Sequence, residues 1–483
     1  MLERNTAPDL SVLFAGKIHS PNPFWLASAP PTNCGDQVMR AFDAGWGGAV
    51  WKTLGDPIVN VSSRYSSVDW NGQRMMGLNN IELITDRPLE TNLREISDVK
   101  KRYPKHALIA SLMVESRREA WHKIVQQSED AGADGLELNF GCPHGMSERG
   151  MGSAVGQVPE YTEMITGWVK EKARTPVLVK LTPNITDIRT VARAAKRAGA
   201  DGLSAINTIN SITGIDLDTF IPRPNVDGKS SHGGYCGPAV KPIALNMVQQ
   251  VECDPEASLP LSGIGGISDW RDAVEFLLLG CSTVQVCTAV MHYGYRIIED
   301  MTDGLSNWMA EKGFARISDF QSLSLPRVQE WKHLNLNYKI VARIHEEKCI
   351  GCQLCYTACW DGAHQCIHMD RVGESRPAGS GHNGVHLTPA MREAQSRGVI
   401  AVTPIPKLDH ARSAPGSEPN LTPLARIPRV DESECVGCNL CYLVCPVPGC
   451  ITMEEIEQNL PAQSWEQRTA SSQNPSMTGR NCD

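Results

Sequence analysis

Two short runs of cysteine have a spacing that suits metal binding. They read CIGCQLCYTAC at 349–359 and CVGCNLCYLVC at 435–445, and both follow Cys-x-x-Cys-x-x-Cys-x-x-x-Cys. Where two such runs bind two [4Fe–4S] clusters, three thiolates of one run and the fourth cysteine of the other hold each cluster. We therefore predict one cluster on Cys349, Cys352, Cys355 and Cys445, and a second on Cys435, Cys438, Cys441 and Cys359.

A pair of structural zinc sites is the alternative interpretation of these runs. Zinc sites usually combine two Cys-x-x-Cys halves rather than three thiolates and a distant fourth. The second run ends in Cys445-Pro446, as the iron–sulfur pattern does, whereas the first ends in Cys359-Trp360, which removes no ligand. The runs favour iron–sulfur clusters, and hence a protein that moves electrons one at a time.

The chain before the cysteine runs alternates short apolar segments with segments of helical period, as βα units do. Helical stretches include 35–44, 117–131, 187–198 and 269–279. The candidate strands are 24–29, 48–53, 108–113, 135–140, 177–182, 202–208, 259–264 and 282–288. Eight βα units in about 300 residues predict a (β/α)8 TIM barrel. A doubly wound sheet is the alternative.

Polar residues stand at the C-terminal ends of the predicted strands, where TIM barrels place their chemistry. They are Ser28, Lys52, Thr53, Asn139, Lys180, Asn207, Thr208, Gly265, Gly266 and Thr288. For any one of them a structural hydrogen bond is the alternative, but strand ends converge on one barrel mouth. We therefore expect them to face a common ligand.

The segment GIGGIS at 263–268 follows the seventh strand. It lacks the spacing of a dinucleotide fingerprint, but it suits the phosphate site that barrels build after strands seven and eight. A tight βα turn is the alternative. A phosphate site with redox clusters downstream favours flavin mononucleotide (FMN), and Lys52 and Lys180 would then face the N1/O2 edge of its ring.

The glycine-rich segment 137–157 follows the fourth strand and presents Cys142. An unperturbed thiol has a pKa near ~8.5, so it is mostly protonated at neutral pH and can donate a proton. Cys142 is therefore the candidate general acid, with a buried inert thiol as the alternative. His144 and Glu148 either orient it or face water.

Three amides and a hydroxyl suggest what the barrel mouth binds. Asn80, which we place with Glu82 in the loop after the second strand, would join Asn139, Asn207 and Thr208 there. Such groups offer donors and acceptors to a flat ring with alternating C=O and N–H groups. This suits a pyrimidine better than a sugar or a lipid, although each asparagine taken singly is equally an ordinary loop residue.

Composition limits the class of protein. The chain has 483 residues, 41% of them hydrophobic and 21% charged, with 17 cysteines. No apolar run is long enough to span a membrane, and the N-terminus lacks the apolar core of a signal peptide, so we expect a cytoplasmic protein whose cysteines serve redox chemistry. The net charge of −8 argues against a nucleic-acid partner.

These features divide the chain into regions. We expect the catalytic barrel at 1–315, a linker at 316–342 and a small α+β bacterial-ferredoxin-like domain at 343–458. The stretch of about 370–428 is rich in Gly, Pro, Ser and His and is predicted to be an inserted loop. The tail at 459–483 is predicted to be disordered.

Several segments together resemble a known family. The runs LASAPPT, WKT, GLNNIELI, ELNFGCPHGMSERGMG, KLTPN, INT, GIGGI and QVCTAV precede the two cysteine runs. They resemble the FMN and C-terminal iron–sulfur portion of dihydropyrimidine dehydrogenase, as carried by the separate bacterial catalytic subunit. The match covers about residues 20–310 and both cysteine runs, and the CPHGMSERGMG loop is its most specific part.

The resemblance implies roles for named residues. Cys142 would donate the proton to C5 of uracil or thymine, and hydride from reduced FMN would reach C6. Asn80, Asn139, Asn207 and Thr208 would hold the substrate. Ser28, Lys52, Thr53, Asn80, Lys180, Gly265, Gly266 and Thr288 would hold FMN.

The resemblance also implies a partner. Full-length members of the family carry FAD and nicotinamide domains that are not visible in this chain, so it implies a hetero-oligomer with a flavoprotein that oxidises NAD(P)H. The long insertion between the cysteine runs departs from the family pattern. Competing hypotheses are a dihydroorotate dehydrogenase-like flavoenzyme, a tRNA dihydrouridine synthase-like protein and a pure electron carrier.

Overall fold

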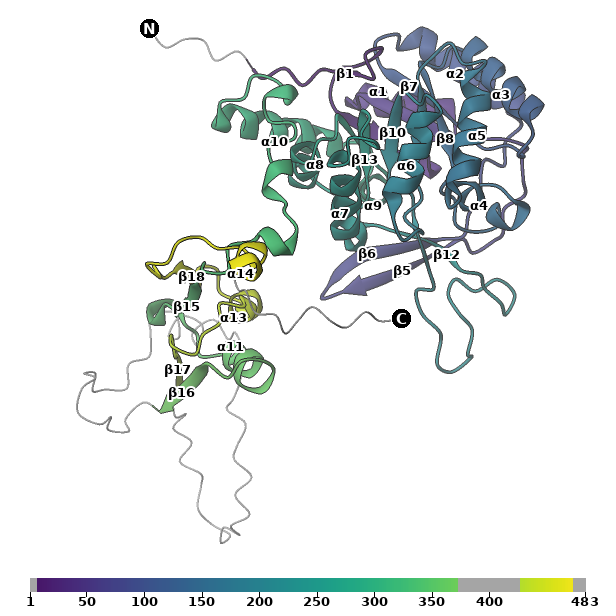
Figure 1. The fold of residues 1–483 in the computed structure, drawn as a ribbon. Helices are drawn as coiled ribbons and strands as arrows, with labels where there is room; N and C mark the ends of the chain where they lie inside the picture. Colours follow the sequence, from purple (N-terminus) through teal and green to yellow (C-terminus); the bar gives the residue numbers. More distant parts are fainter. Residues whose placement is uncertain (1–6, 372–425, 472–483) are drawn as a thin grey trace, which may run out of the picture. The chain divides into compact units, whose positions relative to one another are not determined.

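The computed structural model describes residues 7–371 and 426–471, in two compact units, Met1–Val328 and Gln329–Asp483. In the first unit eight parallel strands close into a barrel (Figure 1). In hydrogen-bonding order they are β10 (Gly202–Ala205), β13 (Leu261–Ile264), β14 (Thr283–Val286), β3 (Phe24–Leu26), β4 (Gly48–Leu54), β7 (Ala107–Leu112), β8 (Gly135–Asn139) and β9 (Val177–Lys180). Each coincides with a predicted strand, so the TIM barrel is confirmed and the doubly wound sheet is excluded.

Helices cover the outside of the barrel (Figure 1). Four turns from helix to strand depend on a glycine with positive φ, because Gly45, Gly132, Gly199 and Gly280 have φ between +86° and +116°. The helices are α1 (Gly35–Ala44), α2 (Leu89–Arg102), α3 (Arg118–Asp130), α4 (Ser153–Gly156), α5 (Pro159–Lys170), α6 (Ile188–Arg197), α7 (Lys241–Glu252), α8 (Trp270–Leu278), α9 (Thr288–Tyr293) and α10 (Ile297–Lys312). The four predicted helical stretches correspond to α1, α3, α6 and α8.

Side chains of the barrel strands alternate between the helix layer and the interior. The outward set joins the helices in one large apolar core. The inward set forms an apolar floor at one level of the barrel, where Trp25, Val50, Ile109 and Leu178 pack against Phe14 and Ile18. Phe14 and Ile18 come from a hairpin of β1 (Val12–Phe14) and β2 (Ile18–Ser20). The floor leaves the carboxyl ends of the strands as the open side.

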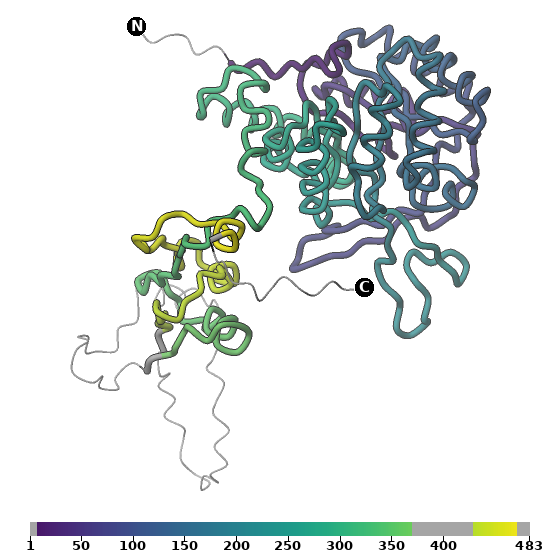
Figure 2. The backbone as a smooth tube through the Cα atoms, viewed as in Figure 1, coloured from purple at the N-terminus to yellow at the C-terminus, as the bar shows by residue number. Residues whose placement is uncertain are grey.

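Two excursions from the barrel pair in a separate antiparallel sheet. The sheet has the order β11 (Ile209–Ser211), β12 (Gly233–Cys236), β6 (Gln73–Asn80) and β5 (Tyr65–Trp70). Figure 2 shows both excursions at the same end of the barrel. The sequence predicts a loop for Asn80, but Asn80 ends β6 and pairs with Tyr65 and Gly234. The polar composition of these strands hides their pairing, because none of their residues is a buried member of the main apolar core, although Leu78 and Asn79 are buried.

The second unit is built from two similar halves. Antiparallel pairs join β15 (Ile340–Ile344) to β18 (Ile451–Glu455) and β16 (Ile367–Arg371) to β17 (Arg426–Val430). Each cysteine run contains a short helix, α11 (Leu354–Tyr356) or α13 (Leu440–Val444). Helix α11 continues into a π-helical segment at Thr357–Asp361. This is the small ferredoxin-like domain that the sequence predicts.

The predicted inserted loop and the predicted disordered tail lie mostly or partly outside the described residues. Most of the predicted inserted loop, 372–425, lies outside the described residues, as does 472–483 of the predicted disordered tail. The first part of that tail is ordered, however, with α14 at Trp465–Ser471. Hydrogen bonds explain the order, because Leu336 N donates to Gln463 O at 2.9 Å and Asn337 Nδ2 donates to Pro461 O at 2.7 Å.

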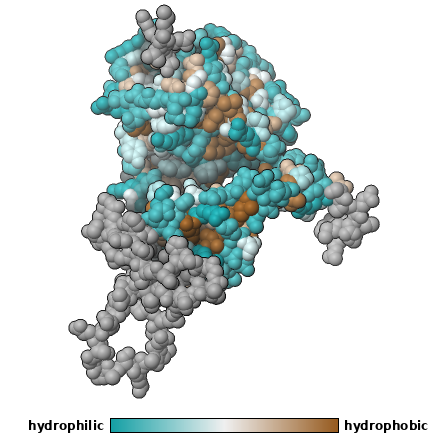
Figure 3. All heavy atoms as spheres, turned by 90° about the vertical axis from the view of Figure 1, so that its left-hand side faces the viewer, coloured by the Kyte–Doolittle hydropathy of each residue, from teal (hydrophilic) through white to brown (hydrophobic). Residues whose placement is uncertain are grey.

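The surface is consistent with burial of the apolar side chains under the helices. Hydrophilic residues cover most of the face that Figure 3 shows, and apolar residues form limited patches on it. Within the described ranges 7–371 and 426–471, no helix has the length and apolar content to cross a membrane.

Candidate active site and cluster cavities

The carboxyl ends of the barrel strands surround one cavity, with ≈ 980 Å³ of space that includes its opening to solvent. Of the strand-end residues predicted from sequence, those in its wall are Ser28, Lys52, Thr53, Asn80, Asn139, Cys142, Lys180, Asn207, Thr208 and Gly265. Two others lie behind the wall. Gly266 follows Gly265, and Thr288 donates from Oγ1 to Cys236 Sγ at 3.2 Å. The barrel therefore brings the predicted set together.

Hydrogen bonds fix the orientation of the strand-end amides. Asn139 Nδ2 donates to Thr53 Oγ1 at 3.0 Å, and Asn207 Nδ2 donates to Asn139 Oδ1 at 2.9 Å. Asn207 Oδ1 accepts the backbone N–H of Thr208 at 2.8 Å. A side-chain amide has two donor hydrogens and two acceptor lone pairs, so each asparagine keeps capacity for a ligand. The network thus presents oriented polar groups to the cavity.

Two buried lysines each stand beside a carboxylate. Lys52 Nζ lies 2.7 Å from Glu82 Oε1, and Lys180 Nζ lies 3.4 Å from Glu137 Oε1. Glu82 also accepts from Arg64 at 2.7 Å and from the Tyr65 hydroxyl. Burial would raise the pKa of Glu82, but Lys52, Tyr65 and Arg64 together hold that pKa below its ordinary value. Glu82 is therefore a carboxylate in the cavity wall.

The segment after β8 folds back to hold Cys142 in the wall of the cavity. Cys142 O accepts from Ser147 Oγ at 2.7 Å and from Ser153 N at 3.0 Å. Its thiol donates to His144 O at 3.5 Å. Burial raises the pKa of the Cys142 thiol to about 11, and Lys180 opposes this only in part. Cys142 is thus protonated at neutral pH, as proton donation requires.

The two residues predicted to assist Cys142 differ in position. His144 is buried and its Nε2 lies 3.2 Å from Glu82 O. Burial lowers the pKa of His144, so its ring is neutral. Glu148 is exposed and faces water. Only His144 belongs to the site.

A turn of glycines lies against the start of α7. Gly265 and Gly266 have φ of +133° and +76°, and Gly237 has φ of +94°. A Cβ on Gly266 would stand 2.8 Å from Lys241 N and 2.9 Å from Gly237 O. Only glycine allows this approach of backbone to a helix N-terminus, which is a favourable place for a phosphate. The cradle fits the phosphate of FMN.

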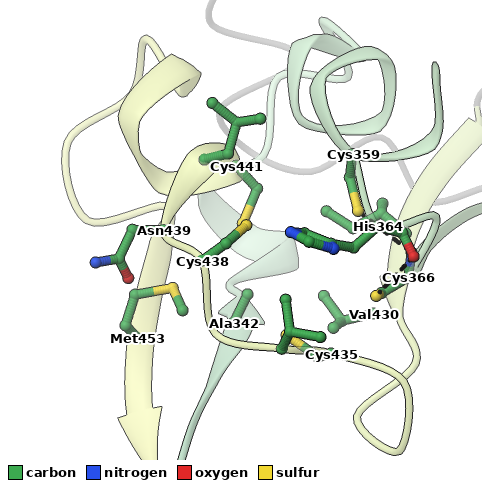
Figure 4. A pocket seen from close by; sticks show the side chains of 13 residues that line it. Ala342, Cys359, His364, Cys366, Val430, Cys435, Cys438, Asn439, Cys441 and Met453 are labelled. Carbon is green, nitrogen blue, oxygen red and sulfur yellow. Dashed lines mark hydrogen bonds between the residues drawn. The ribbon is translucent and has the colours of Figure 1, made fainter. Parts of the chain in front are cut away.

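Two smaller cavities in the second unit collect the cysteines of the two runs, and each has ≈ 340 Å³ of space that includes its opening to solvent. The lining of one includes Cys349, Cys352, Cys355 and Cys445, and that of the other includes Cys359, Cys435, Cys438 and Cys441. Each cavity thus takes three thiols from one run and the fourth from the other, which is the arrangement that fits a [4Fe–4S] cluster. Figure 4 shows the second cavity, with the thiols of Cys359 and Cys438 and the ring of His364 directed into it.

Each of these cavities also contains a fifth cysteine. Cys366 lines the cavity of Cys359, and its backbone N–H donates to Cys359 Sγ at 3.3 Å. Cys450 lines the cavity of Cys445. Each of the two cysteines precedes an isoleucine that begins a strand, Ile367 of β16 or Ile451 of β18. The repeated Cys-Ile pair at 366–367 and 450–451 is therefore the feature of the sequence that could have indicated these cysteines.

The family model described as "Dihydroorotate dehydrogenase" matches residues 18–309, the length of the barrel. The chain belongs to the dihydroorotate dehydrogenase family. A model described as "4Fe-4S binding domain" matches residues 428–448, which contain the second cysteine run. As a member of this family, the chain is an oxidoreductase with a flavoenzyme barrel joined to an iron–sulfur motif.

Relatives in the dihydroorotate dehydrogenase family differ in substrate. The "NAD-dependent dihydropyrimidine dehydrogenase subunit PreA" of Escherichia coli is 47% identical over 74% of this chain and 87% of its own length. The chloroplastic "Dihydropyrimidine dehydrogenase (NADP(+))" of Arabidopsis thaliana is 44% identical over 66% of this chain and 77% of its own. The "Dihydroorotate dehydrogenase B (NAD(+)), catalytic subunit" of Pyrococcus horikoshii is 35% identical over 63% of this chain and 94% of its own.

Several residues of the barrel-mouth cavity of this chain were not predicted from the sequence. Cys236, Cys287 and Tyr65 line it, and Gly237 belongs to the glycine cradle. The glycine-rich run GGYCG at 233–237, directly before α7, is the available signal for Cys236 and Gly237. Tyr65 enters from the antiparallel sheet, which the sequence does not reveal.

Proposed function

We propose that the chain is the catalytic subunit of a dihydropyrimidine dehydrogenase, an NAD(P)-linked oxidoreductase that interconverts uracil or thymine and the 5,6-dihydropyrimidine. The observation that carries the proposal is Cys142, a thiol held protonated beside three oriented amides in one cavity. The two dehydrogenases of this name among the relatives, at 47% and 44% identity, support it.

The substrate is held by the polar groups of the cavity wall. Asn80, Asn139, Asn207 and Thr208 offer donors and acceptors that match the C=O and N–H groups of a pyrimidine. Hydrogen bonds restrict the rotamers of the three amides, because Asn139 and Asn207 bond to each other and Asn80 Oδ1 accepts from Glu82 N at 2.6 Å, so the ring is oriented when it binds. Cys142 then gives its proton to C5 of the ring, or takes it back in the reverse direction.

FMN would be held by residues from five barrel strand ends and by Asn80 at the end of β6. Ser28, Lys52, Thr53, Asn80 and Lys180 would hold its ring and ribityl chain from the cavity wall, with Thr288 behind that wall, and Gly265 and Gly266 would cradle its phosphate. When bound, reduced FMN supplies the hydride for C6. The two lysines stabilise negative charge at the N1/O2 edge of the ring.

The clusters connect the barrel to a partner. Cys349, Cys352, Cys355 and Cys445 hold one [4Fe–4S] cluster, and Cys435, Cys438, Cys441 and Cys359 hold the other. Their chemistry is one-electron relay. We propose that a flavoprotein subunit with FAD oxidises NAD(P)H and delivers electrons to them, so the enzyme is a hetero-oligomer.

A dihydroorotate dehydrogenase activity is the second candidate. The family model over 18–309 and the 35% identical archaeal relative favour it. The second unit argues for the first candidate, because that relative's alignment covers 63% of this chain and 94% of its own length, which leaves the relative little room for a second unit of this size.

An anaerobic assay distinguishes the candidates. The iron-reconstituted chain receives electrons from a reduced dye and is offered uracil, orotate or a tRNA transcript. We expect loss of uracil absorbance and formation of dihydrouracil. Reduction of orotate without reduction of uracil would assign the chain to the second candidate, and reduction only of tRNA would overturn both.

A further inference from the structure

A carboxylate lies inside the barrel, below the mouth. Glu137 is on β8 and is fully buried. Its Oε2 accepts from Ser204 Oγ at 2.8 Å and from Gln285 Nε2 at 3.0 Å. Branched apolar residues are usual at such interior positions of TIM barrels, and the floor of this barrel is apolar. The acid therefore requires an explanation beyond packing.

The second carboxylate oxygen of Glu137 faces one cation. Oε1 accepts no hydrogen bond from the described residues, and Lys180 Nζ lies 3.4 Å from it. A buried charge is costly unless it is paired. Each member of this pair therefore restricts the position of the other.

Lys180 joins this pair to the cavity. Lys180 is opposite Asn139 in the β8–β9 register, two residues beyond Glu137 on the way to the mouth. It is 5% exposed and lines the cavity with Cys142. Its ammonium group therefore lies between the interior carboxylate and whatever occupies the mouth.

The other lysine of the mouth is neutralised differently. Lys52 pairs with Glu82, which is itself part of the cavity wall and also binds Arg64 and Tyr65. Removal of one contact leaves Glu82 with two others. Within the described part of the chain, Lys180 forms an ion pair only with Glu137. Its effective charge toward the cavity thus depends on one residue.

We propose that Glu137 is a positioning residue that sets the electron affinity of the flavin site through Lys180. The role rests on the proposed binding of FMN. With Glu137 in place, the carboxylate holds Lys180 and offsets part of its charge. Without that carboxylate, Lys180 presents its full charge to the ring edge, so the flavin becomes a stronger electron acceptor.

Sulfite addition to the oxidised flavin measures this property without turnover, because sulfite binds electron-poor flavins more tightly and bleaches their absorbance. We expect the reconstituted holoprotein with Glu137→Gln, which preserves shape and hydrogen bonding to Ser204, to bind sulfite more tightly by on the order of tenfold. Lys180→Met should weaken sulfite binding. In the Lys180→Met background, Glu137→Gln should add no further change, because the effect passes through Lys180.

A matched control separates this role from loss of a buried ion pair. Glu129 is also buried, but it pairs with Arg174 at 2.9 Å outside the mouth. Glu129→Gln should lower stability and leave sulfite affinity unchanged. If Glu137→Gln does not fold, Glu137→Asp shortens the side chain and should produce a smaller shift of the same sign.

The outcomes are distinct. An unchanged sulfite affinity in Glu137→Gln with FMN bound would overturn the positioning role alone. An equal shift in the wild-type and Lys180→Met backgrounds would assign the effect to the field of Glu137 instead of to Lys180, and would also overturn it. If the reconstituted wild-type protein binds no FMN, the proposed function and this role are both overturned.

Discussion

Cys142 is suited to proton transfer because it combines exposure to the cavity with a weakly acidic thiol. Its backbone is held by Ser147 and Ser153, and its pKa is raised to about 11 by burial. A nucleophilic cysteine shows the opposite, a pKa lowered by neighbouring positive charge. At this residue the structure therefore supports an acid and argues against a covalent catalyst.

Replacement of Cys142 tests this assignment. Cys142→Ala should retain FMN and both clusters and lose on the order of 10²–10⁴-fold in kcat for uracil, the usual contribution of a general acid. Cys253→Ala is the matched control, since Cys253 is exposed at the end of α7, outside the cavity. Wild-type rates in Cys142→Ala at neutral pH would remove the thiol from the mechanism.

The residues of the site were predictable where they stand at strand ends and less so elsewhere. Lys52, Asn139 and Lys180 follow apolar runs whose period marks the strands, so position alone identifies them. Glu137 is hidden, because one acid within an apolar run does not reveal that it faces the barrel interior. Cys366 and Cys450 lie outside the four-cysteine pattern, so only the repeated Cys-Ile pair indicates them.

At the scale of elements, the glycine turn and helix α7 together form the proposed phosphate cradle. Gly266→Ala should lower the FMN content of the purified protein, because its Cβ would stand 2.8 Å from Lys241 N at a φ of +76°. Gly313→Ala is the matched control, since Gly313 has the same φ of +76° and open space around it. Full FMN content in Gly266→Ala, measured by flavin absorbance after denaturation, would contradict the cradle.

The other end of α7 carries an acid whose ionisation opposes folding. Burial raises the pKa of Glu252 to about 7 from an ordinary value of 4.5. The folded state thus keeps the proton that the unfolded state loses, and stability should fall as pH rises from about 4.5 to 7. Glu252→Gln should remove this loss and raise the unfolding free energy at pH 8 by roughly 1–3 kcal/mol. Denaturant titrations at pH 5 and pH 8 measure it, and an equal gain at both would contradict the ionisation argument.

The elements themselves were predictable to different degrees. Long periodic segments with apolar strands between them identify all eight barrel strands, because burial on both faces demands continuous apolar runs. The sheet of β5, β6, β11 and β12 lacks that signal, since its strands are short or polar and depend on pairing between distant segments. The sequence does not predict helix α14 for a similar reason, because the order of this segment depends on contacts with residues 336–337.

At the scale of the whole molecule, each cluster cavity collects cysteines from two distant parts of the sequence, and the proposed clusters would be ligated by both runs. Cys359→Ser with Cys435→Ser should remove two ligands from one cavity and lower the iron content from about eight to about four per chain. Cys359→Ser with Cys349→Ser should damage both cavities and remove nearly all iron. If each run held its own cluster, the two results would be exchanged. Zinc instead of iron in the wild type would overturn the cluster assignment.

The crossed arrangement of thiols also has a consequence for biosynthesis. A ribosome makes Cys349, Cys352 and Cys355 long before Cys445. The set that contains Cys359 is completed by Cys441, and the other set is completed by Cys445, only four positions later. Neither centre can therefore be loaded on a nascent chain that stops before 441. An mRNA truncated before the codon for residue 441 would therefore yield the barrel without a complete set of four cysteines in either cavity.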